Sequence, residues 1–150
     1  MITMIPVTGS ERDSFLQMAI RHFSELNRAF IPRDDWKQHY FESIRATPGV
    51  FLRWIISEGE RVGFILFGLE RRGFVPSKTG FIYELFVAPE FRRRGIARHC
   101  AAEAIKELSA FGAFRIQLEV AEGNRPAAEF WETLGFSRVA ARYSMDTGHK

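Results

Sequence analysis

The spacing of hydrophobic residues along the chain predicts alternating helices and strands. After a short apolar opening segment (2–7), apolar residues recur at helical spacing over 15–30, and Pro32 ends this first helix. A second helix is expected to begin near Asp34 and to end at Thr47, which is followed by Pro and Gly. Two helices are therefore expected before the main block of strands.

The next part of the chain has the residue pattern of β-strands. β-branched and aromatic runs over 50–57 and 61–70, separated by a polar, glycine-containing segment (58–60), predict a β-hairpin. Residues 71–78 contain Gly and Pro and predict a loop, and 81–87 predicts a third strand of this block.

In the C-terminal part of the chain, apolar residues alternate between helical spacing and strand spacing. Helical spacing returns from about 94 to 111 and is closed by Gly112. Strand, helix and strand are expected over 114–120, 125–134 and 136–145. The complete order β-α-α-β-β-β-α-β-α-β predicts an α/β protein whose mixed sheet has helices on both faces.

Composition restricts the class of protein. A chain of 150 residues with 46% hydrophobic and 26% charged residues is expected to fold as one domain, 1–150, and is not disordered. Its one cysteine, Cys100, excludes a disulfide framework, and the scattered histidines give no set of metal ligands, so we expect no metal. Without a signal peptide or an apolar run of about 18 residues, the expected compartment is the cytoplasm.

The positive charge is unevenly distributed. The net charge is only +3, yet 17 of the 21 basic residues are arginine, which suggests an anionic partner. Four of these arginines are Arg92, Arg93, Arg94 and Arg98, around the predicted entrance of the 94–111 helix. A strand that ends at Val87, a Pro at 89 and a helix that begins near Gly95 leave backbone N–H groups free for an anion. The alternative is a solvated basic turn, but the combination with small residues at Gly95 and Ala97 favours an anion site.

This segment carries a family resemblance. The pattern Val87-x-Pro89-x-x-Arg92-x-x-Gly95-x-Ala97 resembles the acetyl-CoA signature of the GNAT superfamily of N-acetyltransferases. A second block is similar to the same family: Leu118-x-Val120, Asn124, Ala127 or Ala128, Phe130 and Leu134-Gly135-Phe136. The resemblance covers nearly the whole chain and implies a single GNAT-type domain, with acetyl-CoA as co-substrate and an amine as acceptor.

The resemblance also implies positions for the coenzyme. The backbone of Leu85, Phe86 and Val87 would pair with the pantetheine arm like an added strand, and a backbone N–H near Phe86 or Val87 would stabilise the tetrahedral intermediate. The diphosphate would be held around the helix entrance, by Arg92, Arg93, Arg94, Gly95, Ile96, Ala97 and Arg98. From the second block, Asn124 would face the pantetheine or the thiol, and Phe130 joins the coenzyme-binding set.

Glu84 is the candidate general base. Strict alternation places it beside Ile82 and Phe86 on one sheet face, where a carboxylate is costly, while Tyr83 points the other way. A purely structural Glu84, paired with one of the arginines, is the alternative.

The general acid is left open. Many family members have a tyrosine where this chain has Trp131, whose indole cannot act as an acid near neutral pH and which we expect to pack in the core. The thiolate would leave unassisted, take a proton from water, or use Tyr143 or Tyr83.

Three functions follow from the sequence. The first is an N-acetyltransferase acting on a primary amine of a small molecule or peptide by direct attack in a ternary complex, with the acceptor entering over residues 30–36 and the loop 71–80. The second is a non-catalytic acyl-CoA-binding or regulatory module. A nucleic-acid binder ranks last because the net charge is small. We therefore expect neither nucleic acid nor membrane as partner, whereas the family makes a homodimer an expected state.

Overall fold

The computed structural model describes residues 1–70, 74 and 78–149. Most of the predicted loop 71–78 lies outside the described residues. The chain forms two compact units, Met1–Glu119 and Val120–Lys150, and each is described by itself.

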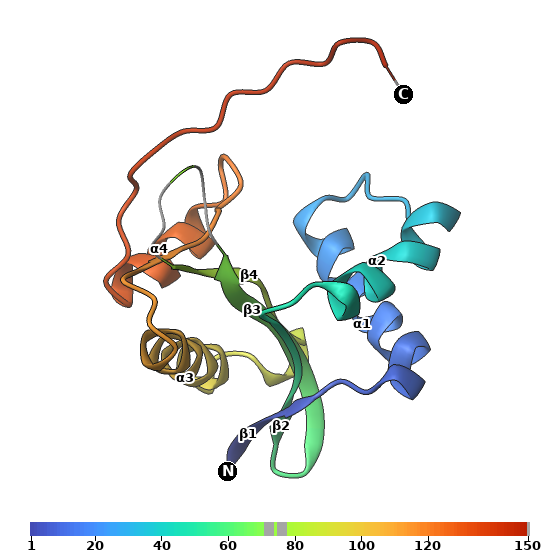
Figure 1. The fold of residues 1–150 in the computed structure, drawn as a ribbon. Coiled ribbons are helices and arrows are strands. Elements are labelled where there is room, and N and C mark those ends of the chain that lie inside the picture. The colour runs from blue at the N-terminus through green and yellow to red at the C-terminus, as the bar shows by residue number, and fades with distance from the viewer. Residues whose placement is uncertain (71–73, 75–77, 150) are drawn as a thin grey trace. The chain divides into compact units, whose positions relative to one another are not determined.

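The first unit is built on a five-stranded mixed sheet. Its strands lie in the order β1-β2-β3-β4-β5; β1 to β4 pair antiparallel, and β5 pairs parallel with β4 (Figure 1). Their bounds are Ile2–Pro6, Val50–Ser57, Glu60–Glu70, Thr79–Val87 and Arg115–Gln117. The predicted α/β fold with a mixed sheet is confirmed, and so is the hairpin of β2 and β3.

Three α-helices lie in the described part of this unit. Two of them, α1 (Arg12–Leu26) and α2 (Asp34–Ala46), lie between β1 and β2, and α3 (Ile96–Ala110) connects β4 to β5. A connection between parallel neighbouring strands needs such a crossover, which a helix provides.

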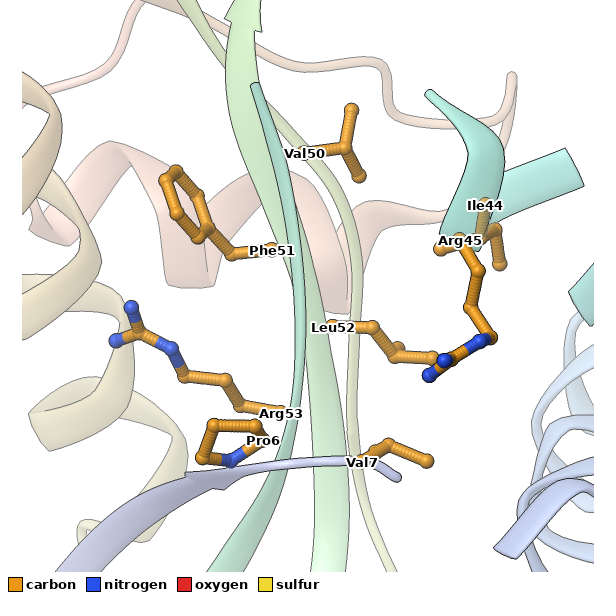
Figure 2. A pocket seen from close by; sticks show the side chains of 8 residues that line it. All are labelled: Pro6, Val7, Ile44, Arg45, Val50, Phe51, Leu52 and Arg53. Carbon is orange, nitrogen blue, oxygen red and sulfur yellow. The ribbon is translucent and has the colours of Figure 1, made fainter. Parts of the chain in front are cut away.

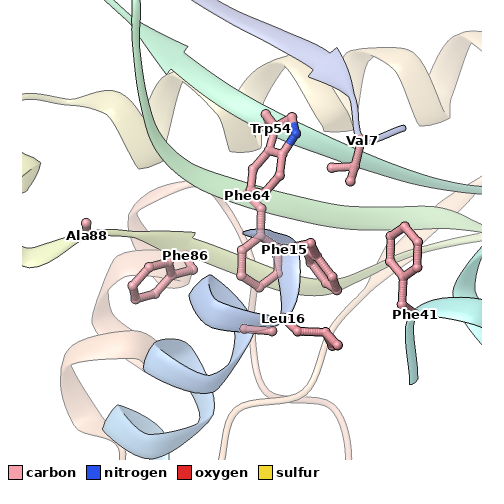
Figure 3. Packing of buried hydrophobic residues seen from close by; sticks show 9 residues of the cluster. Val7, Phe15, Leu16, Phe41, Trp54, Phe64, Phe86 and Ala88 are labelled. Carbon is pink, nitrogen blue, oxygen red and sulfur yellow. The ribbon is translucent and has the colours of Figure 1, made fainter. Parts of the chain in front are cut away.

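One face of the sheet packs against α1 and α2 through aromatic residues. The rings of Phe15 from α1 and Phe64 from β3 are 5.1 Å apart, and Phe41 from α2 and Trp54 from β2 complete the cluster (Figure 3). All four side chains are fully buried. Burial of this size stabilises by about 1.5 to 3 kcal/mol for each large side chain, so this cluster fixes α1 and α2 on the sheet.

The opposite face packs against α3. Along β2, Phe51 and Arg53 point to one side while Leu52 points to the other, as expected for a strand (Figure 2). Arg53 donates two hydrogen bonds of 2.6 Å to the carboxylate of Glu107 on α3, and the Phe51 ring stacks on Phe111 just after that helix. The predicted placement of helices on both faces is confirmed.

The second unit contains α4 (Arg125–Thr133). The strand predicted over 136–145 is wrong, because no residue from 136 to 149 belongs to a strand in the structure. Val139, Tyr143 and Met145 are 80%, 93% and 81% exposed. Local residue preference predicts a strand, but a strand exists only where a neighbouring strand satisfies its backbone hydrogen bonds.

Candidate functional site

β4 pairs with β3 from end to end along one edge and is largely open along the other. On the β5 side only Thr79, Gly80 and Phe81 are paired, because β5 ends at Gln117. From there β4 continues to Val87 with no further strand pairing on that side among the described residues. The predicted pantetheine-binding segment therefore lies on an unpaired edge.

The direction of the backbone groups along this edge follows from the pairing with β3. The N–H of Ala88 donates to a β3 carbonyl 2.8 Å away, and a Cβ added to Gly63 of β3 would lie 1.9 Å from the carbonyl oxygen of Phe86. Phe86 thus directs its backbone groups to β3. Because these groups alternate along a strand, Leu85 and Val87 direct theirs to the open edge. Of the two N–H donors expected from the family, Val87 faces outward and Phe86 does not.

A β-bulge in β4 changes which residues share a face. The consecutive β3 residues Leu66 and Phe67 pair with Glu84 and Ile82, which leaves Tyr83 unpaired between them. Directly paired residues share a face, so Glu84 lies on the face that α1 and α2 cover and Ile82 on the face that α3 covers. The expectation that Ile82 accompanies Glu84 is wrong, since strict alternation holds only without an extra residue.

The bulge also redirects Tyr83. Its ring centroid is 4.9 Å from that of Phe81, which pairs with Gly68 on the same face as Glu84. The Tyr83 hydroxyl donates to Oε2 of Glu70 over 2.5 Å. Tyr83 and Glu84 thus lie on one face, contrary to the expected opposition.

Glu84 has a partner that the sequence did not reveal. Nε2 of His22, on α1, lies 2.5 Å from Oε2 of Glu84. His22 is 7% exposed, whereas the side chain of Glu84 retains 22% exposure. Tyr40 from α2 is close as well: burial, and then the charge of Glu84, raise the pKa of Tyr40 above its ordinary value. Among the described residues, the carboxylate is therefore paired with a histidine and not with an arginine.

The turn between β4 and α3 is the segment predicted to hold an anion. Two residues adopt left-handed conformations, Arg93 with φ +65° and Gly95 with φ +77°. Such turns direct successive N–H groups into one concavity. Gly95 is the N-cap of α3 and no side chain caps this helix; the first bond inside it runs from His99 N–H to Gly95 O at 3.0 Å. The N–H groups of the first turn of α3, which precede His99, therefore have no intrahelical acceptor.

The arginine side chains of this turn make different contacts. Arg92 donates to the carbonyl of Val87 at 2.7 Å and to Glu25 of α1 at 2.6 Å, so its side chain ties the end of β4 to α1. Arg94 lies over the ring of Phe91. Arg93 is exposed. Part of the local positive charge is therefore already paired within the protein. Arg92 holds the end of β4 and α1 together beside the candidate site.

Ile96 and Ala97 complete the first turn of α3. Ile96 is 3% exposed and holds the helix start to the protein, whereas Ala97 is half-buried. Arg98 follows on the exposed surface. The structure thus brings the residues predicted to hold the diphosphate into one turn.

The candidate residues of the second unit lie on or after α4. Asn124 is the N-cap of α4, and its side chain accepts the N–H of Ala127 at 3.3 Å. Phe130 packs edge-on against Trp131 with centroids 4.9 Å apart. Tyr143 is exposed, as noted above. Asn124 therefore has a structural role at the helix start, beside the coenzyme role that the family implies.

Two cavities lie away from these residues. A cavity of about 300 Å³ opens beside the part of β2 that β1 leaves uncovered, and its lining includes Ile44, Arg45 and Leu52 (Figure 2). A second cavity of about 320 Å³ lies between β1 and α3, with His99 and Glu103 in its lining. Neither contains a residue of β4 or of the turn that follows it.

Three further observations concern chemistry outside this site. In the described part of the chain, no three His, Cys, Asp or Glu side chains are grouped so that they could hold a metal ion. None of the helices described there has the length and apolar character needed to cross a membrane. Cys100 is buried in α3, and this burial raises the pKa of its thiol to about 12, which makes it a core residue.

An open strand edge, an N–H-rich turn at a helix start and a carboxylate on the same strand make up the candidate site. The family model described as "Acetyltransferase (GNAT) family" matches residues 16–136. The chain belongs to this family.

Curated relatives carry N-acetyltransferase names. An uncharacterized N-acetyltransferase of Methanocaldococcus jannaschii is 28% identical over 89% of this chain and 60% of its own length. A ribosomal protein bS18-alanine N-acetyltransferase of Salmonella typhimurium is 33% identical over 46% of this chain and 49% of its own length. The chain thus spans about half to three-fifths of these two relatives.

Solved structures share the fold. A transcriptional regulator from Bacillus halodurans superposes with a TM-score of 0.79 at 19% identity, covering 97% of this chain and 99% of its own. The aminoglycoside N-acetyltransferase AAC(6')-Iy in complex with CoA reaches 0.76 at 16% identity, covering 99% and 96%. The fold is therefore that of the acetyltransferases.

Proposed function

We propose that this chain is an N-acetyltransferase that transfers the acetyl group of acetyl-CoA to a primary amine by direct attack in a ternary complex. The observation that carries the proposal is the open edge of β4 running into the N–H-rich turn before α3. Family membership supports it, and so does the CoA bound to the structural neighbour AAC(6')-Iy.

The residues present fit a coenzyme of this kind. The outward backbone groups of Leu85 and Val87 would bind the pantetheine arm, and the turn from Arg93 to Ala97 would bind the diphosphate. Gly95 leaves open space at this turn, since a Cβ added there has no atom within 4 Å. When bound, the coenzyme supplies an activated acetyl thioester.

The chain would stabilise developing charge with its backbone. The N–H of Val87 points to the open edge, where the thioester oxygen of a strand-like bound pantetheine would lie. A preorganised donor of this kind typically lowers the barrier by about 2.7 to 4 kcal/mol. Arg92 donates to the carbonyl of the same residue, which belongs to the next peptide unit, and so ties the end of β4 to the turn that follows it.

Glu84 would accept the proton that the acceptor amine loses. It lies on the strand that would hold the thioester, and part of its side chain reaches solvent. General-base catalysis typically contributes about 10²- to 10⁴-fold. Tyr143 and Tyr83 remain our candidates for protonating the thiolate, together with water.

The acceptor is a primary amine of a small molecule or a peptide. Glu84 places negative charge on the face beneath α1 and α2, which favours a cationic amine. Two relatives point to different acceptors, since one is named for the alanine of ribosomal protein bS18 and a structural neighbour for aminoglycosides.

The test is an assay of CoA-thiol release with acetyl-CoA and a panel of amines. The panel contains sisomicin, neamine, spermidine, an alanine-initiated hexapeptide and a lysine peptide, with calorimetric titration of acetyl-CoA alongside. We expect acetyl-CoA binding and turnover on at least one class. Binding without turnover on any amine would replace the proposal with the non-catalytic acyl-CoA module, and absence of binding would refute both.

A further inference from the structure

His22 is the most deeply buried polar partner of the candidate base. Three rings, those of Phe23, Phe64 and Phe86, surround it with centroids 5.0 to 5.6 Å away. Packing on this scale fixes the imidazole in one orientation. Its Nε2 lies 2.5 Å from Oε2 of Glu84.

The chemistry of the pair assigns the direction of this hydrogen bond. An ionised carboxylate only accepts, so Nε2–H of His22 must donate to Oε2 of Glu84. A buried polar group needs a partner, and within the described chain Glu84 is the one that His22 has. Oε1 of Glu84 has no hydrogen-bond partner among those residues.

Other charged groups lie at the rim of this arrangement. Tyr40 faces Glu84 from α2, and the guanidinium groups of Arg21 and Arg92 lie 5.8 Å from the centroid of the Phe86 ring. Both arginines are paired with other carboxylates, Arg21 with Glu90 and Arg92 with Glu25. His22 is therefore the donor that holds Glu84.

We propose that His22 is a positioning residue for Glu84. It occupies Oε2 and leaves Oε1 as the oxygen that accepts the proton of the acceptor amine. This inference rests on the proposed function, because it gives His22 a task only if Glu84 is the base. It also explains a histidine among aromatic rings, where a phenylalanine would pack without the need for a polar partner.

The experiment compares His22→Phe, His22→Gln and Glu84→Gln with the double variant His22→Phe/Glu84→Gln. Steady-state rates are measured against pH with each amine of the panel above. His22→Phe keeps the volume and removes the donor, whereas glutamine can restore an N–H near the position of Nε2. The matched control is His39→Phe, because His39 is exposed on α2. Thermal unfolding verifies that each variant is folded.

We expect His22→Phe to lower kcat about 10- to 100-fold with little change in KM, the effect of losing one charge-assisted hydrogen bond. His22→Gln should recover part of this loss, and His39→Phe should behave like the wild type. In the Glu84→Gln background, His22→Phe should have little further effect, since both changes disable the same group.

The outcomes separate the two proposals. If Glu84→Gln leaves kcat and its pH profile unchanged, Glu84 is not the base and the proposed mechanism fails together with the inference. If Glu84→Gln slows the reaction but His22→Phe does not, or if the two effects multiply fully, the inference alone is overturned.

A spectroscopic measurement tests the inference without any acceptor. The Nε2–H of His22 should give a ring ¹⁵N–¹H signal that is protected from exchange with water in the wild type and loses this protection in Glu84→Ala. If the wild-type protein lacks a protected signal, or if Glu84→Ala retains it, His22 does not position Glu84.

Discussion

Replacing Gly95 by glutamine or by glutamate tests the diphosphate site with a nearly isosteric pair. Gly95 has φ +77°, and nothing lies within 4 Å of a Cβ added there. Both variants therefore carry the same backbone strain, about 1 to 2 kcal/mol for a left-handed residue with a side chain, and no steric clash. For a chain of this length, each should unfold roughly 2 to 8 °C below the wild type.

The two variants should differ in coenzyme affinity. A carboxylate about 5 Å from one phosphate charge costs about 1 to 3 kcal/mol, depending on the local dielectric constant. Gly95→Glu should thus bind acetyl-CoA about 5- to 150-fold more weakly than Gly95→Gln, as measured by calorimetric titration. Because this is a charge effect at an exposed turn, the difference should shrink as the salt concentration rises.

The control for the comparison is the unfolding temperature. Gly95→Gln and Gly95→Glu should unfold within a degree or so of each other, because the strain is common to both. Equal acetyl-CoA affinities for the two variants would refute the placement of the diphosphate at this turn. Dephospho-CoA, which keeps the diphosphate but lacks the ribose phosphate, should show the same ratio.

Two further predictions concern stability. Gly63→Ala should lower the free energy of unfolding by about 1 to 3 kcal/mol, because its Cβ would overlap the carbonyl of Phe86. The control is Gly9→Ala, whose Cβ would meet only the end of the Arg45 side chain. Equal denaturation midpoints for the two variants would contradict this prediction. The backbone N–H of Thr8, and then its hydroxyl, lower the pKa of Glu11 from 4.5 to about 2, so the stability that ionised Glu11 contributes is complete above pH 4.5 and is lost as the pH falls towards 2. Glu11→Gln should remove this part of the pH dependence in denaturant titrations between pH 2 and 6, and an unchanged slope would count against it.

Local pattern predicted the elements whose pairing partners are close in sequence. The strand predicted over 50–57 has the same bounds as β2. Its partner β3 follows directly after a tight turn, in which Glu58 and Gly59 both have positive φ, so the pairing is local. The start of α3 at Gly95 was also predictable, because a strand, a proline and a glycine before a helix fix the backbone locally.

Features that depend on distant partners were not predictable in the same way. The strand expected over 136–145 requires a neighbour, which a local pattern does not specify. The pairing of His22 with Glu84 joins positions 62 residues apart. One signal was present: His22 follows Phe15 and Ala19 at the spacing of one helix face, so its burial could have been foreseen, although its partner could not.

The bulge in β4 determines which residues of that strand lie on which face of the sheet. Tyr83 is one residue in excess of its β3 partners. The alternation between the two faces of the sheet is therefore shifted by one residue after Tyr83. Deleting Tyr83 would restore strict alternation and leave Glu84 and Ile82 on their present, opposite faces, whereas strict alternation with Tyr83 retained would place both on one face. The bulge is therefore as much a part of the site as the side chains, and an alignment that matches this strand to a regular strand without a gap at Tyr83 would compare residues of opposite faces.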